Sequence, residues 1–581
     1  MFRKRVAAGA ALLAMVVPAI AAGAGGSAQA DDGLAEAVTT RKTMVVTANP
    51  LATAAGEAVL ASGGSAVDAM VAVQAMLGLV EPQSSGIGGG AFVVYWDERR
   101  KQLTTYDARE KAPAAASPDR FEGLGFFDAW QSGLSVGVPG VPKLMEEMHA
   151  EHGRRRFFSL IAPAAQLAWD GFPLSQRTSD QAGTLASFGL FRDPVAREYF
   201  LQPDGTAKPA GTIVRNQDYA RTLWKLGRND GAGFYTGTTA QAVVEGVTTD
   251  PAIPGDMTLD DLRNYDIVKR DAVCVDYRDR EVCGMGPPSS GGLAVGQILG
   301  ILDNFDLSSY GPTSLETVHL VTQASRLAFA DRNQYVGDSD FVDVPVEGML
   351  DPDYLASRAA LIDLTQDLPA EPGLPPGVGE DLAADLVDTS NGTSHVSIID
   401  RYGNALSMTT TIESSFGNGV MVDGFLLNNQ LTDFSFAPVD ADGLPIANRV
   451  EPNKRPRSSM SPTIVFDAAG EVEIVTGSPG GSRIIGYTAQ SIVNMVDFDL
   501  DPQEAINTPH FLNRNGSTDL EAPIPGVTGP DDVSQLQADL EALGHTVNVR
   551  GLTSGLSIIQ VVGRDLVGGA DLRRDGTVGG S

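Results

Sequence analysis

The sequence changes character sharply at residue 393. Between residues 364 and 392, prolines and acidic residues are frequent and aromatic residues are absent. Such a segment cannot bury enough apolar surface to order itself, which predicts an exposed linker. Directly after it, residues 393–400 and 405–412 are two β-rich runs separated by turn residues, which predicts a β-hairpin.

The predicted hairpin places a threonine at the first position of its first strand. If Tyr402 and Gly403 form the loop, Thr393 pairs with Ile412 and lies within reach of Thr411. A break in the chain just before Thr393 would give this residue both a hydroxyl nucleophile and a free α-amine. An α-amine has a pKa near ~8, so it can act as a general base without a histidine. On this spacing alone, an ordinary threonine at a strand start is the alternative interpretation.

Helix and strand patterns alternate along the rest of the chain. Residues 157–363 mix amphipathic runs with Pro and Gly breaks and resemble scaffold, and the polar, Gly-rich stretch after Asp565 is expected to pair weakly or fray. The expected helices are 51–60 and 65–80, and the expected strands are 91–96, 103–107, 463–466 and 472–476.

The charge of the chain limits its partners, and its first residues indicate export. With 42 Lys and Arg against 73 Asp and Glu, the net charge is -31, which would repel a nucleic acid. Residues 1–30 contain a basic start, an apolar run and a final A-Q-A, the order of a cleavable secretory signal. No later stretch is long and apolar enough to span a membrane, so we expect a secreted or otherwise extracytoplasmic protein.

Two cysteines, Cys274 and Cys283, flank a β-rich run that is interrupted by polar turn residues. A hairpin would bring the two sulfurs together, and in an oxidising compartment they would form a disulfide. Two free, buried thiols are the alternative.

Common catalytic motifs are missing from the sequence. The six histidines are scattered, and neither HExxH nor CxxC nor GxSxG occurs, so we expect no metal, no cofactor and no nucleophile-elbow hydrolase. The Gly-rich stretches 86–90 and 477–482 could hold a phosphate through backbone N–H groups or could be ordinary turns.

Several motifs, in order along the chain, resemble the γ-glutamyltranspeptidase family of N-terminal-nucleophile (Ntn) hydrolases. They include EPQSSGIGGG (81–90), DAREKAP (107–113), TSHVS (393–397), LLNNQ (426–430), PNKRP (452–456), SSMSP (458–462) and TGSPGGSR (476–483). The resemblance implies an α+β fold, a four-layer αββα sandwich with two mainly antiparallel central sheets between helical layers. It also implies a precursor that cleaves itself into a large subunit (31–392) and a small subunit (393–581), which together form one αββα domain.

The resemblance also assigns the catalytic residues. Thr393 is the expected nucleophile, first on the carbonyl of Gly392 during self-cleavage and later on the γ-carbonyl of a glutamyl substrate. Thr411 is expected to orient the Thr393 hydroxyl. The backbone N–H groups of Gly480 and Gly481 are expected to hold the oxyanion, where losing one such donor can cost ~10²-fold or more in rate.

Six further residues match the family's substrate-binding positions. Arg109, Ser458 and Ser459 are expected to bind the α-carboxylate of the substrate. The residues expected to bind its α-ammonium group are Asp433, Gln430 and Glu413, the last at a position where many members have Asn.

Two details of the site remain open from the sequence. His395 lies two residues after Thr393, hence on the same face of the strand, where it could be either a base or a packed histidine. The region 434–457 corresponds to the lid of some members but contains only two aromatic residues, both Phe, which would leave the pocket open.

The function that the resemblance implies is that of a secreted, self-processing γ-glutamyltransferase or glutathione hydrolase. It would pass the glutamyl group from glutathione or a similar donor to water, an amino acid or a peptide. The alternatives are a cephalosporin or glutaryl acylase of the same fold, and a non-catalytic extracellular protein that binds γ-glutamyl peptides.

Overall fold

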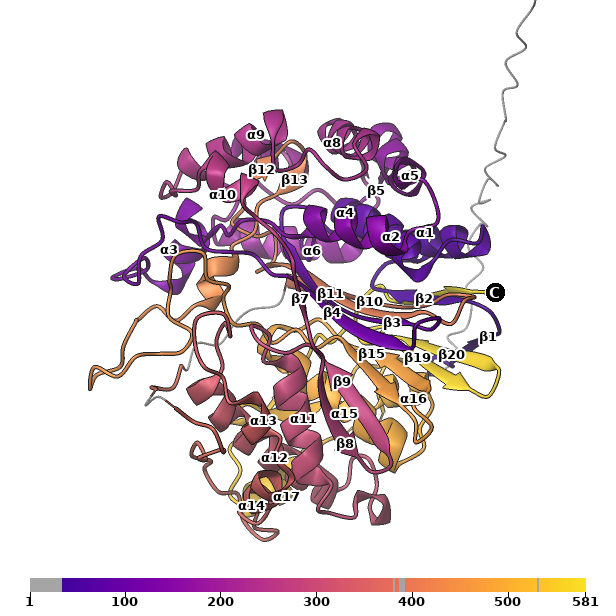
Figure 1. Cartoon of the computed structure of the whole chain (residues 1–581), viewed down its shortest axis with the longest axis vertical. Helices are drawn as coiled ribbons and strands as arrows, with labels where there is room; N and C mark the ends of the chain where they lie inside the picture. The colour runs from indigo at the N-terminus through magenta and orange to yellow at the C-terminus, as the bar shows by residue number, and fades with distance from the viewer. Residues whose placement is uncertain (1–33, 380–381, 386–391, 530–531) are drawn as a thin grey trace, which may run out of the picture.

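The computed structural model describes residues 34–379, 382–385, 392–529 and 532–581. The expected signal peptide therefore lies outside the described residues. Two seven-stranded sheets stack face to face at the centre of the molecule, and helices cover the outer face of each (Figure 1). This is the predicted four-layer αββα sandwich.

The first sheet contains the predicted hairpin, and we call it the nucleophile sheet. Its strands pair in an antiparallel manner. In spatial order they are β21 (Thr577–Gly580), β2 (Met44–Thr47), β10 (Gly392–Ile399), β11 (Ala405–Glu413), β3 (Gly90–Asp97), β4 (Gln102–Ala108) and β7 (Val268–Arg270).

The second sheet is also antiparallel. Its order is β1 (Val38–Thr40), β20 (Asp565–Ala570), β19 (Ser557–Val562), β15 (Val472–Thr476), β14 (Thr463–Phe466), β9 (Arg280–Gly284) and β8 (Val273–Tyr277). Short two- and three-stranded pairings lie outside these sheets: β5 (Phe172–Pro173) with β6 (Ile213–Val214), β12 (Met421–Val422) with β13 (Phe425–Leu426), and β16 (Phe511–Asn513) with β17 (Thr518–Glu521) and β18 (Val547–Arg550).

Helices from the first half of the chain lie above the nucleophile sheet in Figure 1. The helix α2 is buried along its whole length, as its all-round apolar sequence predicts. Its N-cap Ser65 and Asp68 form a capping box that fixes its start. These helices are α1 (Pro50–Ala61), α2 (Ala66–Val80), α3 (Phe126–Trp130), α4 (Val141–His152), α5 (Phe157–Asp170), α6 (Gln176–Ser187), α7 (Pro194–Phe200), α8 (Gln217–Arg228), α9 (Gly237–Thr248) and α10 (Leu259–Arg263).

The other helices lie on the side of the second sheet in Figure 1. The longest is α12, with 21 residues. They are α11 (Gly291–Leu302), α12 (Leu315–Tyr335), α13 (Val346–Met349), α14 (Pro352–Ala359), α15 (Ile484–Asp497), α16 (Pro502–Asn507) and α17 (Ser534–Ala542).

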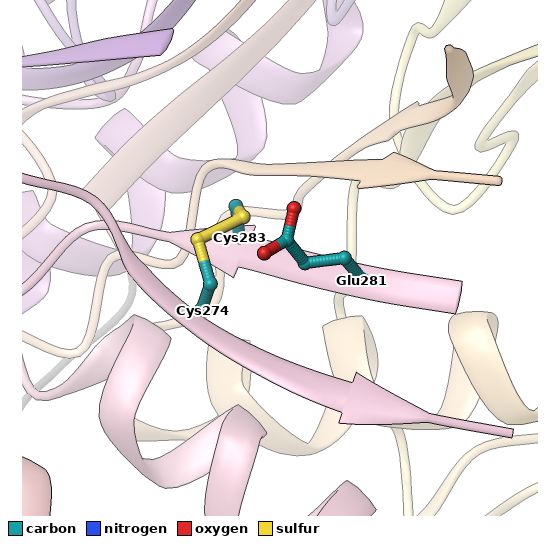
Figure 2. A group of neighbouring side chains, drawn as sticks. All are labelled: Cys274, Glu281 and Cys283. Carbon is teal, nitrogen blue, oxygen red and sulfur yellow. A yellow bond between two sulfur atoms is a disulfide. The ribbon is translucent and has the colours of Figure 1, made fainter. Parts of the chain in front are cut away.

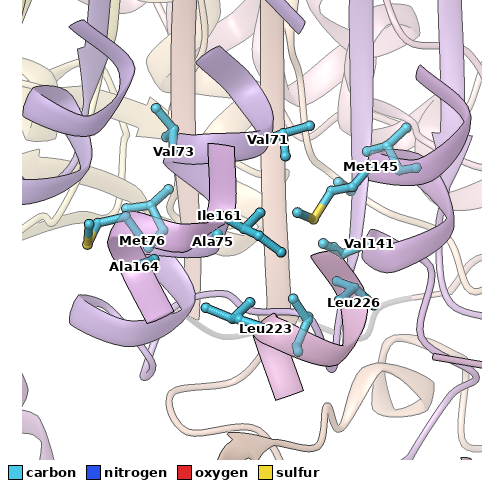
Figure 3. Close-up of a cluster of buried hydrophobic side chains, with 14 of the residues drawn as sticks. Val71, Val73, Ala75, Met76, Val141, Met145, Ile161, Ala164, Leu223 and Leu226 are labelled. Atoms are coloured by element: carbon cyan, nitrogen blue, oxygen red, sulfur yellow. The ribbon is translucent and has the colours of Figure 1, made fainter. Parts of the chain in front are cut away.

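Separate apolar cores hold the layers together. Between the nucleophile sheet and its helices, side chains of α2, α4, α5 and α8 interdigitate (Figure 3). The core between the two sheets includes Met44, Val94, Ile399 and Ile464. A third core joins the second sheet to α11, α12 and α15. Burial on both faces explains why the central strands are apolar or uncharged almost throughout.

Cys274 and Cys283 form the predicted disulfide. They pair directly across β8 and β9, with an S–S distance of 2.07 Å (Figure 2). Glu281 lies beside them, so the three residues could resemble a metal-ligand cluster. The two sulfurs are bonded to each other, however, which removes them as thiolate ligands. The hairpin therefore has a structural role.

The predicted fraying of the chain after Asp565 is wrong. Residues 565–570 form β20 inside the second sheet, and residues 577–580 form β21, the edge strand of the nucleophile sheet next to β2. The prediction was wrong because it took the glycines in this stretch as a sign of weak strand pairing. Gly568, Gly569 and Gly579 have close neighbours where a side chain would stand, so they serve close packing rather than flexibility.

The described part of the predicted linker, 364–379 and 382–385, lies mostly at the surface but is held at several points. Asp367 forms an ion pair with Arg326, and Ala370 packs against the core of the second sheet. Within the described residues, no helix is long and apolar enough to cross a membrane.

Candidate active site

The hairpin β10–β11 carries Thr393 at its start, and its register differs by one residue from the prediction. Thr393 pairs with Thr411 rather than with Ile412. The N–H of Asp400 donates to the carbonyl oxygen of Asn404 at 3.1 Å, which closes a loop of three residues, 401–403, instead of two. The last of these residues, Gly403, has φ +83°. This is the left-handed position that a three-residue hairpin loop needs. The correction brings Thr411 directly opposite the expected nucleophile.

Hydroxyl groups connect Thr393 to the peptide bond that precedes it. The Thr393 hydroxyl donates to Thr411 Oγ1 at 3.3 Å, and the Thr411 hydroxyl donates to the carbonyl oxygen of Gly392 at 2.5 Å. The N–H of Glu413 donates to Thr411 Oγ1 at 2.8 Å and so fixes this hydroxyl. A Cβ on Gly392 would lie 2.4 Å from the carbonyl oxygen of Glu413, so only glycine fits there.

The motifs did not indicate Arg574, which holds the other side of Thr393. Its guanidinium donates to the carbonyl oxygen of Thr393 at 2.7 Å and to the carbonyl oxygens of Thr553 and Ser554. Burial lowers the pKa of Arg574 to about 9. The buried Glu81 carboxylate acts in the opposite direction on this pKa. This arginine lies in the stretch that was expected to fray.

His395 is a packed histidine. Its Nδ1 contacts the Thr409 hydroxyl at 2.9 Å, and its Nε2 contacts the Ser397 hydroxyl at 3.2 Å. Gly477 lies against the ring so closely that a Cβ there would be 2.3 Å from His395 Cε1. Burial lowers the pKa of His395 to about 3. Both ring nitrogens are thus engaged away from Thr393, and the interpretation as a base is not supported.

The glycine pair Gly480–Gly481 lies in the tight turn between β15 and α15. Gly480 has φ +142° and Gly481 has φ +60°, backbone conformations that side chains rarely adopt. A Cβ on Gly480 would also lie 2.6 Å from the Tyr487 ring. Gly481 lines the same cavity as Thr393. The turn therefore places bare backbone at the wall of the cavity that Thr393 also lines.

Arg109, Ser458 and Ser459 meet at the same cavity. Arg109 follows the end of β4 and is almost completely buried. Its guanidinium donates to Asp433 and to the carbonyl oxygens of Pro456 and Arg457. The hydroxyl of Ser459 accepts a hydrogen bond from Arg332 at 2.8 Å. A buried cation beside two hydroxyl groups is suitable chemistry for a carboxylate.

Three buried acceptor atoms in the site have no hydrogen-bond partner among the residues that the structure describes. They are Asp433 Oδ1, Glu413 Oε1 and Gln430 Oε1, and all three residues line the cavity. Burial raises the pKa of both carboxyl groups, and for Glu413 the nearby Asp433 raises it further. Unpaired buried acceptors are costly, so a cationic donor placed among them would be strongly favoured.

A buried ion pair joins the segment before residue 392 to the loops of the site. Asp385 accepts from Arg457 Nη2 and from Asn448 Nδ2, each at 2.9 Å. Asn448 also donates to the carbonyl oxygen of Asp433 at 2.7 Å and accepts from the N–H of Arg457. Asp385 thus supports both the Asp433 loop and the loop that leads to Ser458. The motifs gave no signal for it.

The cavity between these groups is small, about 20 Å³. Thr393 at its wall is only 4% exposed, so the open pocket expected from the sequence is not what the described residues form. The region 434–457 contributes no side chain to the cavity wall. Instead, its Phe436 stacks on Phe121 at 4.8 Å and lies against Phe126. The cavity wall consists of Arg109, Thr393, Thr411, Glu413, Gln430, Asp433, Ser458, Ser459, Met460, Gly481 and Ile484.

Comparison with known proteins places this arrangement in a family. The γ-glutamyltranspeptidase family matches residues 52–581. The chain is 38% identical over 522 residues to a glutathione hydrolase proenzyme of Bacillus subtilis, covering 86% of this chain and 84% of that protein. It is 35% identical over 532 residues to the glutathione hydrolase proenzyme of Escherichia coli, covering 88% of each.

Two solved structures have the same fold as this chain. A cephalosporin acylase from Bacillus halodurans superimposes with a TM-score of 0.82 at 25% identity, covering 96% of this chain and 99% of that chain. The γ-glutamyltranspeptidase of Helicobacter pylori superimposes with a TM-score of 0.55 at 31% identity, covering 60% of this chain and 98% of that chain. The fold, the hairpin and the sequence match over nearly the whole length lead to one conclusion: this chain belongs to the γ-glutamyltranspeptidase family.

Proposed function

We propose that the protein is an autoprocessed γ-glutamyltransferase and glutathione hydrolase in which Thr393 is the nucleophile. The observation that carries the proposal is the set of hydroxyl contacts around the Gly392–Thr393 peptide, beside a cavity with a buried arginine and unpaired acceptors. Relatives that are glutathione hydrolase proenzymes support both the activity and the processing.

Maturation starts when the Thr393 hydroxyl oxygen attacks the carbonyl carbon of Gly392. The C–N bond to Thr393 breaks as its nitrogen takes up the hydroxyl proton, and the acyl group moves to the hydroxyl oxygen as an ester. This step leaves the α-amine of Thr393 free. Thr411 stabilises the developing charge because its hydroxyl already donates to this carbonyl oxygen. Water then hydrolyses the ester, which regenerates the Thr393 hydroxyl and separates the large subunit (31–392) from the small subunit (393–581).

The mature nucleophile then acts on a γ-glutamyl amide. The free α-amine takes the proton of the Thr393 hydroxyl, whose oxygen attacks the γ-carbonyl carbon. The N–H groups of Gly480 and Gly481 hold the oxyanion, and the amine of the leaving group departs with a proton. Water, an amino acid or a peptide then attacks the ester on Thr393 and releases the glutamyl group.

Substrate recognition divides between the two ends of the glutamyl group. Arg109, Ser458 and Ser459 bind its α-carboxylate. Its α-ammonium group donates to the unpaired oxygens of Asp433, Glu413 and Gln430. Residues 1–30 direct the precursor out of the cytoplasm. The exported enzyme then meets these γ-glutamyl donors outside the cytoplasm.

The cephalosporin acylase superposition makes a glutaryl acylase the second candidate. A glutaryl amide lacks the α-ammonium group and would leave the three acceptors unpaired, which costs several kcal/mol. A non-catalytic protein that binds γ-glutamyl peptides is the third candidate, and it would neither process itself nor turn over substrate.

Turnover by the purified protein tests these candidates. We expect hydrolysis of γ-glutamyl-p-nitroanilide at a kcat/KM at least 10²-fold above that of glutaryl-p-nitroanilide, which differs only by the missing ammonium group. Equal or reversed preference would instead favour the acylase. Processing without turnover of either compound would contradict both activities, and an unprocessed, inactive protein would favour the binding protein.

A further inference from the structure

Five arginines lie in connections at the end of the nucleophile sheet that is farthest from Thr393. They come from three connections that are distant in sequence: the β3–β4 turn, the α4–α5 loop and the β10–β11 turn. All five are exposed, and none forms an ion pair within the described ranges of the chain. We call this group the arginine surface; it consists of Arg99, Arg154, Arg155, Arg156 and Arg401.

Three of these arginines lie around Tyr402 and Gly63. The guanidinium carbon of Arg154 lies 3.7 Å from the centre of the Tyr402 ring, and the Tyr402 hydroxyl donates to the carbonyl oxygen of Gly63 at 3.0 Å. Nitrogens of Arg155 and Arg401 both approach Gly63, at 3.2 and 3.9 Å from the position that its Cβ would occupy. The three guanidinium groups are therefore neighbours.

The arginine surface borders a concave site of about 260 Å³. Two carboxylates also line it, and both already have cationic partners. Asp97 forms an ion pair with Arg100 at 3.0 Å, and Glu151 pairs with Lys269. The cavity therefore keeps an excess of positive charge from Arg99 and Arg154. Its wall consists of Tyr95, Asp97, Arg99, Arg100, Glu151, His152, Gly153, Arg154, Tyr402 and Asn404.

This concentration of positive charge contrasts with the rest of the protein. The chain as a whole carries -31, and most of its exposed charge is acidic. Neighbouring arginines repel one another, so their convergence costs free energy unless an anion binds between them. Guanidinium groups bind phosphate oxygens in a bidentate manner, and a cavity with aromatic walls suits a compact group rather than an extended polymer.

We propose that the arginine surface is a binding site for a phosphate group, presented either by a small soluble phosphate compound or by the headgroup of an anionic lipid. The site lies at the turn of the β10–β11 hairpin, and Thr393 lies at its open end. The eight residues of β10 separate the two by roughly 25 Å. A ligand at the arginine surface would thus not cover the cavity at Thr393.

The test uses the processed protein with two probes. Pyrophosphate binding is measured by calorimetry, and binding to vesicles of equal parts phosphatidylglycerol and phosphatidylcholine is measured by co-sedimentation, both in 50 and 150 mM salt. The variant is Arg99→Gln/Arg154→Gln/Arg155→Gln. The matched control is Arg192→Gln/Arg215→Gln/Arg228→Gln, which removes the same charge from exposed arginines elsewhere that also have no ion pair within the described residues.

We expect the arginine-surface variant to bind at least one probe at least tenfold more weakly than wild type, and the control to stay within about twofold. Loss confined to pyrophosphate identifies a small phosphate ligand, and loss confined to vesicles identifies the lipid headgroup. Absence of wild-type binding to both probes, or equal losses in the two variants, would overturn the proposal. If the triple variant does not fold, the single exchange Arg99→Gln in the exposed turn is expected to weaken binding about threefold, and no change would overturn the proposal.

Discussion

Removing the hydroxyl of Thr411 should slow self-cleavage far more than it destabilises the fold. In Thr411→Val the side chain keeps its shape but loses three hydrogen bonds at once: to the carbonyl oxygen of Gly392, from the Thr393 hydroxyl and from the N–H of Glu413. The first of these acts on the carbonyl group that the nucleophile attacks.

The size of the effect follows from these contacts. One preorganised donor to a developing oxyanion is worth ~10²–10³-fold in rate, so we expect processing of Thr411→Val to slow by about 10²-fold or more. The N–H of Glu413 and the carbonyl of Gly392 are left without this partner in a buried site, which costs about 1–3 kcal/mol each in stability.

The assay is a time course of precursor and subunit masses after rapid purification, with circular dichroism to verify folding. Thr411→Ser keeps the hydroxyl and is the matched control, expected to process within about tenfold of wild type. If Thr411→Val folds and is cleaved within about threefold of the wild-type rate, the hydroxyl does not stabilise the oxyanion and the reasoning is refuted.

Two further predictions concern buried charges. Asp385→Asn leaves Arg457 buried without its carboxylate, so urea unfolding should show a loss of about 3–5 kcal/mol and KM for γ-glutamyl-p-nitroanilide should rise; an unchanged midpoint and KM would contradict the supporting role of Asp385. Burial raises the pKa of Glu110 to about 8 from an ordinary value of 4.5. The folded state therefore binds a proton that the unfolded state releases between these values, and this contribution to stability is lost as pH rises through about 8. Glu110→Gln removes this dependence, so its melting temperature relative to wild type should increase from pH 5 to pH 8.5; a constant difference would show that Glu110 titrates normally.

Local patterns predicted the parts of the fold in which sequence and burial agree. Alternation identified 463–466 and 472–476 as strands with the observed ends, and the apolar run of α2 identified a buried helix. The hairpin was predicted, but its register was not, because the same turn residues suit a two-residue and a three-residue loop, and strand pairing shifts by one residue between the two.

Some residues of the site were likewise predictable from local motifs, and others were not. Thr393, Arg109, Asp433 and Gly481 lie in recognisable motifs, and the structure brings them to one cavity. Arg574 and Asp385 act through contacts between segments that are far apart in sequence, 181 residues in the case of Arg574 and Thr393. No local pattern marks such a contact, so only the three-dimensional arrangement reveals it.

The burial and pairing of β10 and β11 can keep the site in place after the chain is cleaved before Thr393. Both strands are buried along their whole length, and β2 and β3 pair with them on the outer sides. Cleavage before Thr393 cuts the chain at the end of a strand that neighbouring strands still hold. We therefore expect the two subunits to remain together after processing.

The intact mass of purified wild type beside Thr393→Ala tests the central claim most directly. The account predicts two wild-type fragments, the smaller one beginning at Thr393, and a single uncut chain for Thr393→Ala that folds like wild type. Cleavage of Thr393→Ala at the same bond, or a folded wild type that stays whole, would contradict it.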